Sequence, residues 1–148
     1  MSTSAPGLYR RILLVVDLTA DSVVVADRAR AVAAACSAEL ALLHVVEYVP
    51  AEPMGESLLP AAAMELELVA HAEPHLRELA ARLSVPATAC RIETGNTKAE
   101  IIRVAAEMHA DLVVIGSRER HGLSILVNLT EDTVLHAAPC DVLAVRLR

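Results

Sequence analysis

Four short apolar runs, separated by stretches with helical spacing, constrain the fold of this 148-residue chain more than any other feature. Each run is nearly continuous in Val, Leu and Ile, which is typical of parallel strands covered by helices on both faces. A fifth and more polar run, at residues 87–93, is typical of an edge strand. The four apolar runs cover residues 12–16, 40–46, 112–115 and 142–145.

The stretches between these runs predict helices with recognisable ends. Asp21 or Ser22 is the candidate N-cap of the first helix, because both side chains can accept from free backbone N–H groups. The third helix begins at a capping box, Thr97-Lys-Ala-Glu100. Pro74 lies inside the second, where it either kinks the helix or starts a second piece. The expected helices cover residues 24–36, 64–83, 97–108 and 128–138.

The alternation of strands and helices predicts an α/β fold, a single doubly wound, Rossmann-like domain over residues 1–148. Right-handed crossovers place the helices on both faces of a parallel sheet. We expect residues 1–9 to be flexible. Residues 48–62, which contain Pro50 and Gly55, are expected to form a surface loop.

Composition narrows the classes of function. Hydrophobic residues make up 55% of the chain, yet it has no Trp or Phe and only two Tyr. It therefore offers few aromatic platforms on which nucleic-acid bases could stack. The net charge of −6 also argues against a nucleic-acid partner. A nucleotide is not excluded, since a few local donors can hold a phosphate.

The cysteines and the N-terminus favour a cytoplasmic protein. Cys36, Cys90 and Cys140 are odd in number and widely spaced, which is typical of small buried residues in a reducing compartment. The N-terminus holds no apolar signal core, and the apolar run nearest to it is too short to span a bilayer. We therefore expect a soluble cytoplasmic protein without membrane insertion.

Two strand ends carry residues suited to ligand binding. Asp17 leaves the first apolar run directly into a polar turn, and Gly116, Ser117 and Arg118 follow the run at residues 112–115. Gly116 permits close backbone approach, and the other two can donate to an anion. Taken alone, a helix cap at Asp17 and a tight turn at Gly116 explain these residues better.

Other chemistry-bearing patterns are better explained without a ligand. Glu67, His71 and His75 share a helical face, but a proline interrupts it and a fourth metal ligand is missing, so we expect a solvated face and no metal. Residues 95–98 faintly resemble a phosphate loop, yet helix capping explains them. His44 lies inside an apolar run and is expected to be a satisfied core residue.

Three segments of the chain carry a family resemblance when taken in order. They are Arg11-Ile-Leu-Leu-Val-Val-Asp17-Leu-Thr19, His44-Val-Val, and a C-terminal third that runs from Asp111-Leu-Val-Val-Ile-Gly116-Ser-Arg118 through His121-Gly122 to Pro139-Cys140 and Arg146. They resemble the universal stress proteins over nearly the whole chain except the loop around residues 48–62. The resemblance implies a five-stranded sheet of order 3-2-1-4-5, with Asp17 and Gly116 on either side of one crevice at the switch point.

The resemblance also implies an adenine-nucleotide site whose loop is altered in this chain. ATP-binding members carry Gly-x2-Gly-x9-Gly-Ser/Thr after the fourth strand. Gly116 matches the first glycine and Thr130 the final hydroxyl, but Glu119 and Leu129 replace the other two glycines. Glu119 adds negative charge where phosphates would lie, a repulsion on the order of 3 kcal/mol at roughly 5 Å. We therefore expect tight ATP binding to be lost.

The leading expectation is a non-enzymatic stress-response protein that forms a homodimer through its last strand, residues 140–145. The alternative is an AMP- or ATP-binding regulatory module that controls a partner protein such as a transporter. A weak nucleotide hydrolase ranks last, because the sequence shows no positioned base or metal and no catalytic triad. The candidate cofactors are AMP, or ATP with Mg, and the residues expected to bind them are Asp17, Val45, Gly116, Ser117, Arg118, Gly122 and Thr130.

Overall fold

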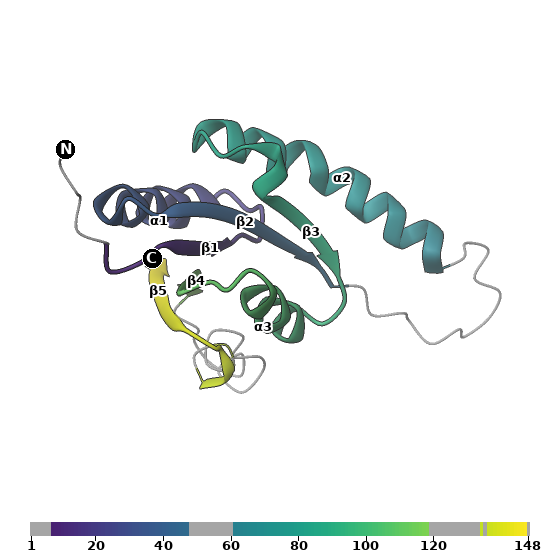
Figure 1. Ribbon diagram of the computed structural model, residues 1–148. Coiled ribbons are helices and arrows are strands. Elements are labelled where there is room, and N and C mark those ends of the chain that lie inside the picture. The colour runs from purple at the N-terminus through teal and green to yellow at the C-terminus, as the bar shows by residue number, and fades with distance from the viewer. Residues whose placement is uncertain (1–6, 48–60, 119–133, 135, 148) are drawn as a thin grey trace.

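Five parallel strands form one sheet in the computed structural model, which describes residues 7–47, 61–118, 134 and 136–147 (Figure 1). The strands are hydrogen-bonded in the order β3-β2-β1-β4-β5, so the predicted doubly wound fold and its strand order are confirmed. The order reverses between β1 and β4, which are neighbours in the sheet. The strands are β1 (Arg11–Val15), β2 (Glu39–Val46), β3 (Cys90–Thr94), β4 (Leu112–Arg118) and β5 (Asp141–Leu147).

Helices connect the strands close to where the sequence predicts them. α2 continues through Pro74 as one helix. Of the two alternatives for this proline, the start of a second helix is therefore wrong. Beside this proline, Nδ1 of His75 donates to the carbonyl of His71 at 3.0 Å. Of the helix expected at residues 128–138, only residues 134 and 136–138 are described, and residues 134, 136 and 137 are helical. The other helices are α1 (Ser22–Cys36), α2 (Ala61–Arg82) and α3 (Thr97–Glu107).

The edge strand begins later than expected. Residues 87–89 form a short 3-10 helix, η1 (Ala87–Ala89), and the strand follows as β3. β3 does lie at one end of the sheet, as its mixed polar sequence predicts. In the part of the chain that the structure describes, no helix is long and apolar enough to cross a membrane. The thiols of Cys36, Cys90 and Cys140 are free and half-buried.

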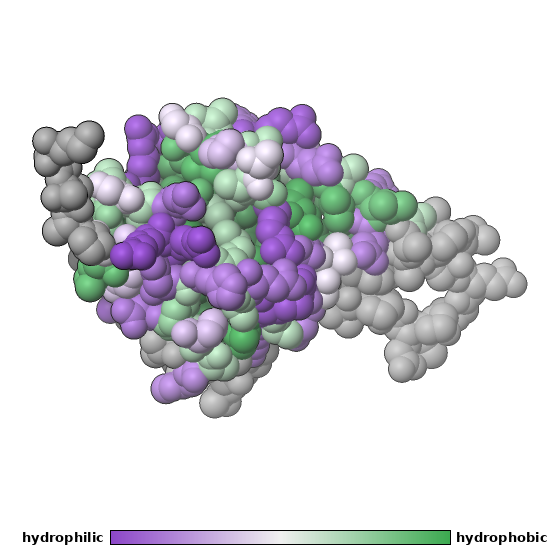
Figure 2. Space-filling model, in the orientation of Figure 1, coloured by the Kyte–Doolittle hydropathy of each residue, from purple (hydrophilic) through white to green (hydrophobic). Residues whose placement is uncertain are grey.

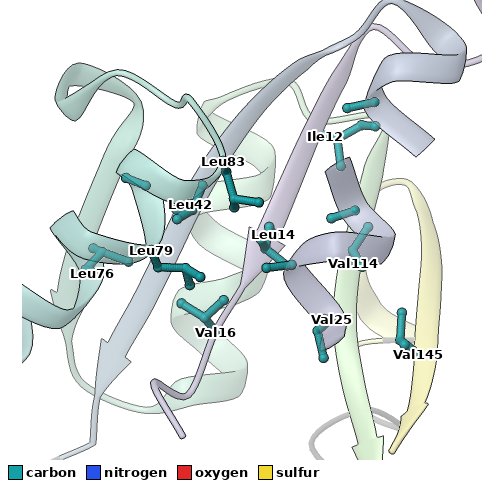
Figure 3. Close-up of a cluster of buried hydrophobic side chains, with 14 of the residues drawn as sticks. Ile12, Leu14, Val16, Val25, Leu42, Leu76, Leu79, Leu83, Val114 and Val145 are labelled. Carbon is teal, nitrogen blue, oxygen red and sulfur yellow. The ribbon is translucent and has the colours of Figure 1, made fainter. Parts of the chain in front are cut away.

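Different helices cover the two faces of the sheet (Figure 1). α1 and α2 pack on one face, where Leu14 and Val114 of the central strands meet Val25 and Leu79 of the helices (Figure 3). α3 packs Ile101 and Val104 on the other face, against Leu13, Leu43 and Val113. Neighbouring residues of a strand thus point into different clusters, which explains why the strands are apolar almost without interruption.

The start of α3 differs from the predicted capping box by one residue. Asn96, with extended backbone, is the N-cap, and its Oδ1 accepts from the backbone N–H of Ala99 at 3.1 Å. Thr97 is the first helical residue, and its hydroxyl bonds elsewhere. At α1 the N-cap is Asp21, one of the two predicted candidates, but its side chain makes no capping hydrogen bond.

Candidate functional site

A cavity of about 410 Å³ lies at the carboxyl ends of β1 and β4, where the strand order reverses. Its volume falls in the range of roughly 300–1,000 Å³ that is usual for small-molecule sites. The structure brings three of the predicted site residues together here: Asp17, Val45 and Gly116. The remaining lining residues, which were not predicted, are Val15, Val16, Ser22, Val25, His44, Glu47, Thr97, Ile101, Ile115 and Leu147.

Asp17 ties the end of β1 to the start of α1. Its Oδ1 accepts three hydrogen bonds, from the backbone N–H of Thr19 at 3.0 Å, the Thr19 hydroxyl at 2.8 Å and the Ser22 hydroxyl at 2.8 Å. The carboxylate closes an Asx turn around Leu18, which has a φ of 60° that is rare for a residue with a branched side chain. Asp17 therefore anchors the first helix and lines the cavity at the same time.

His44 lines the cavity, so the expectation that it is a core residue is wrong. Its ring is half-buried on β2, and it does have the hydrogen-bond partner that was expected. The Val16 carbonyl lies 2.8 Å from Nδ1 and can only accept, so Nδ1 carries a proton. In the neutral ring Nε2 is then an acceptor.

Glu47 and Thr97 join the end of β2 to the first residue of α3. The Thr97 hydroxyl donates to Oε2 of Glu47 at 3.0 Å, across 50 positions of sequence. Glu47 is exposed, and both residues line the cavity. Glu47 could have been predicted from the sequence as a candidate site residue, because it follows the second apolar run just as Asp17 follows the first.

Gly116 lies within β4, so the tight-turn explanation is wrong. It is paired with Val145 of β5, and β4 continues to Arg118. A Cβ at this position would lie 3.0 Å from Cδ1 of Leu147 and 3.1 Å from Cγ2 of Val25. The packing of α1 and β5 against the strand therefore leaves little room for a side chain here, which gives a structural reason for a glycine that does not depend on a ligand.

The other predicted site residues lie partly beyond the cavity. Ser117 and Arg118 end β4 and are paired with Arg146 and Leu147 of β5. Ser117 is half-buried and is not among the residues that line the cavity. Four residues on which the altered loop depends lie outside the described residues: Gly122, Thr130, Glu119 and Leu129.

The polar part of the cavity is acidic. Asp17 and Glu47 contribute two carboxylates, and no Lys or Arg is among the described lining residues. No group of three or more His, Cys, Asp or Glu within the described ranges is arranged to hold a metal ion. Glu67, His71 and His75 are exposed on α2, as expected of a solvated face.

The chain is similar to known proteins over almost its whole length. The sequence model of the universal stress protein family matches residues 8–146. Universal stress protein A homolog 1 of Coxiella burnetii is 36% identical over 141 residues, which cover 95% of this chain and 98% of that protein.

Solved structures share the fold at lower identity. A universal stress protein in complex with cAMP matches with a TM-score of 0.69 and 23% identity, over 95% of this chain and 98% of that one. The universal stress protein UspA from Lactobacillus plantarum matches with a TM-score of 0.73 and 24% identity, over 93% and 98%. These likenesses show a shared architecture.

Proposed function

Because the chain belongs to the universal stress protein family, we propose that it is a non-enzymatic, cytoplasmic stress-response protein that acts as a homodimer and does not bind ATP tightly. The observation that carries this proposal is the charge of the cavity. Its described lining includes the carboxylates of Asp17 and Glu47 and neither Lys nor Arg. A phosphate that lies close to either carboxylate would be repelled by its negative charge. Glu119 and Leu129, in place of two loop glycines, support the same conclusion from the sequence.

The open edge of β5 supports the homodimer. Among the described residues, β5 ends the sheet and pairs with β4 on one side only, so its outer edge can offer backbone N–H and C=O groups to a partner. A second copy can pair with this edge across a two-fold axis, and such a contact closes the assembly. Light scattering at micromolar concentration should give the mass of a dimer. A monomeric mass would contradict this part of the proposal.

The hydrogen bonds of the cavity support a role without catalysis. Oδ1 of Asp17 accepts three hydrogen bonds that organise the turn, and Nδ1 of His44 donates to the Val16 carbonyl. Both groups thus have structural tasks at the strand ends. We expect no phosphate release from ATP by highly purified protein. Release that Asp17→Ala abolishes would overturn this part.

A second candidate function is an adenine-nucleotide-responsive regulator that controls a partner protein such as a transporter. The size and position of the cavity favour it, since about 410 Å³ at the switch point suits a nucleoside-sized ligand. The universal stress protein solved with cAMP supports it by likeness of fold. Asp17 and Val45, two of the residues expected to bind a nucleotide, both line this cavity.

Calorimetric titration distinguishes the two candidates. With MgATP, the first predicts no binding at micromolar ATP, and a micromolar Kd would contradict it. A ligand that binds only the native state raises the unfolding midpoint by mass action, so a thermal shift with millimolar AMP that exceeds the shift with ATP supports the second. An unchanged midpoint with AMP, ADP and ATP supports a dimer that binds no nucleotide.

A further inference from the structure

Two histidines of α2, His71 and His75, form a pair on the exposed surface of the helix. They are four residues apart, so they lie on consecutive turns of one helix face. α2 continues through Pro74 as one helix, and the two ring centroids lie 5.3 Å apart with an angle of 49° between the ring planes. The proline that argued against a metal from the sequence alone therefore leaves the two rings side by side.

The separation of the rings suits two imidazoles that share one metal ion. An imidazole nitrogen lies about 2.1 Å from a bound Zn²⁺, so in a tetrahedral site the centroids of two such rings are roughly 5 Å apart. Two histidines four residues apart on one helix face are also a known way to bind Zn²⁺. The separation of His71 and His75 is therefore close to that of a chelating pair.

A hydrogen bond already orients the second ring. Nδ1 of His75 lies 3.0 Å from the backbone carbonyl of His71, which can only accept. Metal-bound imidazoles usually donate their other ring N–H in this way, often to a backbone carbonyl, and this bond fixes the orientation of the ring. A metal ion binds the neutral ring, so Nε2 of His75 is the nitrogen that can hold it.

The pair lies beside two carboxylates. Both histidines line a second cavity, of about 350 Å³, between α2 and the end of β2. Asp17 and Glu47 line this cavity too. Negative charge close to a site favours a cation over a neutral ligand or an anion.

We propose that His71 and His75 chelate a divalent transition-metal ion such as Zn²⁺, with water in its remaining coordination positions. Imidazole nitrogen suits Zn²⁺, Ni²⁺ and Cu²⁺, whereas Mg²⁺ prefers oxygen ligands. The described ranges hold no group of three or more His, Cys, Asp or Glu arranged around one metal ion. The two histidines are therefore the ligands that these ranges supply, and the bound ion exchanges with solution.

Calorimetric titration of the full chain with ZnCl₂, and separately with MgCl₂, tests the site. We expect Zn²⁺ to bind and Mg²⁺ not to bind. His71→Gln and His75→Gln should each lower the Zn²⁺ affinity about tenfold or more, because each leaves a single ligand where two acted together. The double variant should lose little more than either single one, which is the mark of a chelating pair. His109→Asn is the matched control, since it removes an exposed histidine just beyond the end of α3.

The outcomes decide whether the pair holds the metal. Zn²⁺ binding that both single variants weaken to a similar extent, and that His109→Asn leaves unchanged, supports the inference. Binding that survives in the double variant overturns it, because the ion is then held elsewhere in the chain. Equal binding of Mg²⁺ overturns it too, since the acidic surface alone would then explain the binding. Failure of Zn²⁺ to bind at millimolar concentration also overturns it.

Discussion

Two groups of carboxylates lie beside α3, and their partners differ in kind. At the first residue of the helix, Glu47 accepts from a hydroxyl, and nearby Asp17 accepts from two hydroxyls and a backbone amide. Along the exposed side of α3 the carboxylates pair with guanidinium groups instead, and Figure 2 shows hydrophilic side chains gathered over this side. That ion-pair network consists of Arg91, Glu93, Glu100, Arg103 and Glu107.

The difference distinguishes a surface network of ion pairs from the candidate site at the cavity. In the ion-pair network each carboxylate meets an opposite charge, and the pairs close on themselves at the surface. At the cavity, Asp17 and Glu47 accept hydrogen bonds from neutral donors, and these bonds orient the two carboxylates.

Replacing one carboxylate in each region gives the largest contrast. We expect Asp17→Ala to lower the free energy of unfolding by about 2–3 kcal/mol, because it removes the acceptor of three hydrogen bonds. One of the donors, Ser22, is only 5% exposed and would lose its partner away from water. Glu107→Ala should have a much smaller effect, because its ion pairs are solvent-exposed. Urea unfolding of both variants measures the difference.

Asp17→Asn serves as the control for this contrast. It keeps an oxygen that can accept from Thr19 and Ser22, so we expect a loss within about 1 kcal/mol. Equal losses from Asp17→Ala and Glu107→Ala would remove the distinction between the two regions.

A single methyl group at the cavity floor should have the next largest effect. Gly116→Ala places a Cβ 3.0 Å from Leu147 and 3.1 Å from Val25, so we expect overpacking to lower the free energy of unfolding by about 1–2 kcal/mol. Thermal unfolding checks this value. Leu147→Val shortens the side chain that the new methyl meets, so the double variant should be less destabilised than the sum of the two single ones. Full additivity would show that Leu147 is not the group that meets the methyl.

The fold could be predicted from the sequence because the central strands are apolar on both sides. The runs around Leu14, Leu43 and Val113 are buried between helices, and burial on both faces leaves His44 as the one polar residue in them. The same logic found Asp17 and Gly116, which follow or end such runs. It did not find Glu47 and Thr97 as a pair, because their hydrogen bond depends on bringing β2 and α3 together.

The capping error at α3 has a related cause. Asn96 and Thr97 are adjacent and are both good N-cap residues, so local preferences differ little between them. In the folded chain the Thr97 hydroxyl donates to Glu47, and the Asn96 side chain caps the helix. A tertiary contact thus decides between two nearly equal local arrangements.

The contribution of the ion-pair network to stability should decrease at acidic pH. Hydrogen bonds from Arg103, and then from Arg91, hold the pKa of Glu107 below its ordinary value of 4.5. A carboxyl whose pKa is lower in the folded state stabilises the fold above its unfolded pKa, and this contribution is lost as the pH falls through the folded pKa. We therefore expect the stability difference between the unchanged protein and Glu107→Gln to be present at pH 7 and to shrink below about pH 4.5.

Urea unfolding between pH 7 and pH 3 measures this shrinkage. Glu78→Gln is the control, since it replaces an exposed glutamate on α2 outside the ion-pair network. A difference that stays constant over the whole range would show that the pairs of Glu107 add nothing to stability.

The smallest effect should come from changing the shape of a cation while keeping its charge. Arg103 donates to Glu100 and also to Glu107, with its NH1 group 2.6 Å from the latter, and its NH2 group lies 3.1 Å from Glu93. Arg103→Lys keeps the positive charge but loses the planar fork that reaches several carboxylates at once. The site is exposed, so we expect Tm to fall by no more than about 2 °C, and the fall to vanish in about 1 M salt, where exposed charges are screened. A fall in Tm as large as that of Asp17→Ala, or one that persists in high salt, would mean that the ion-pair network stabilises the fold as strongly as the hydrogen bonds at the cavity do.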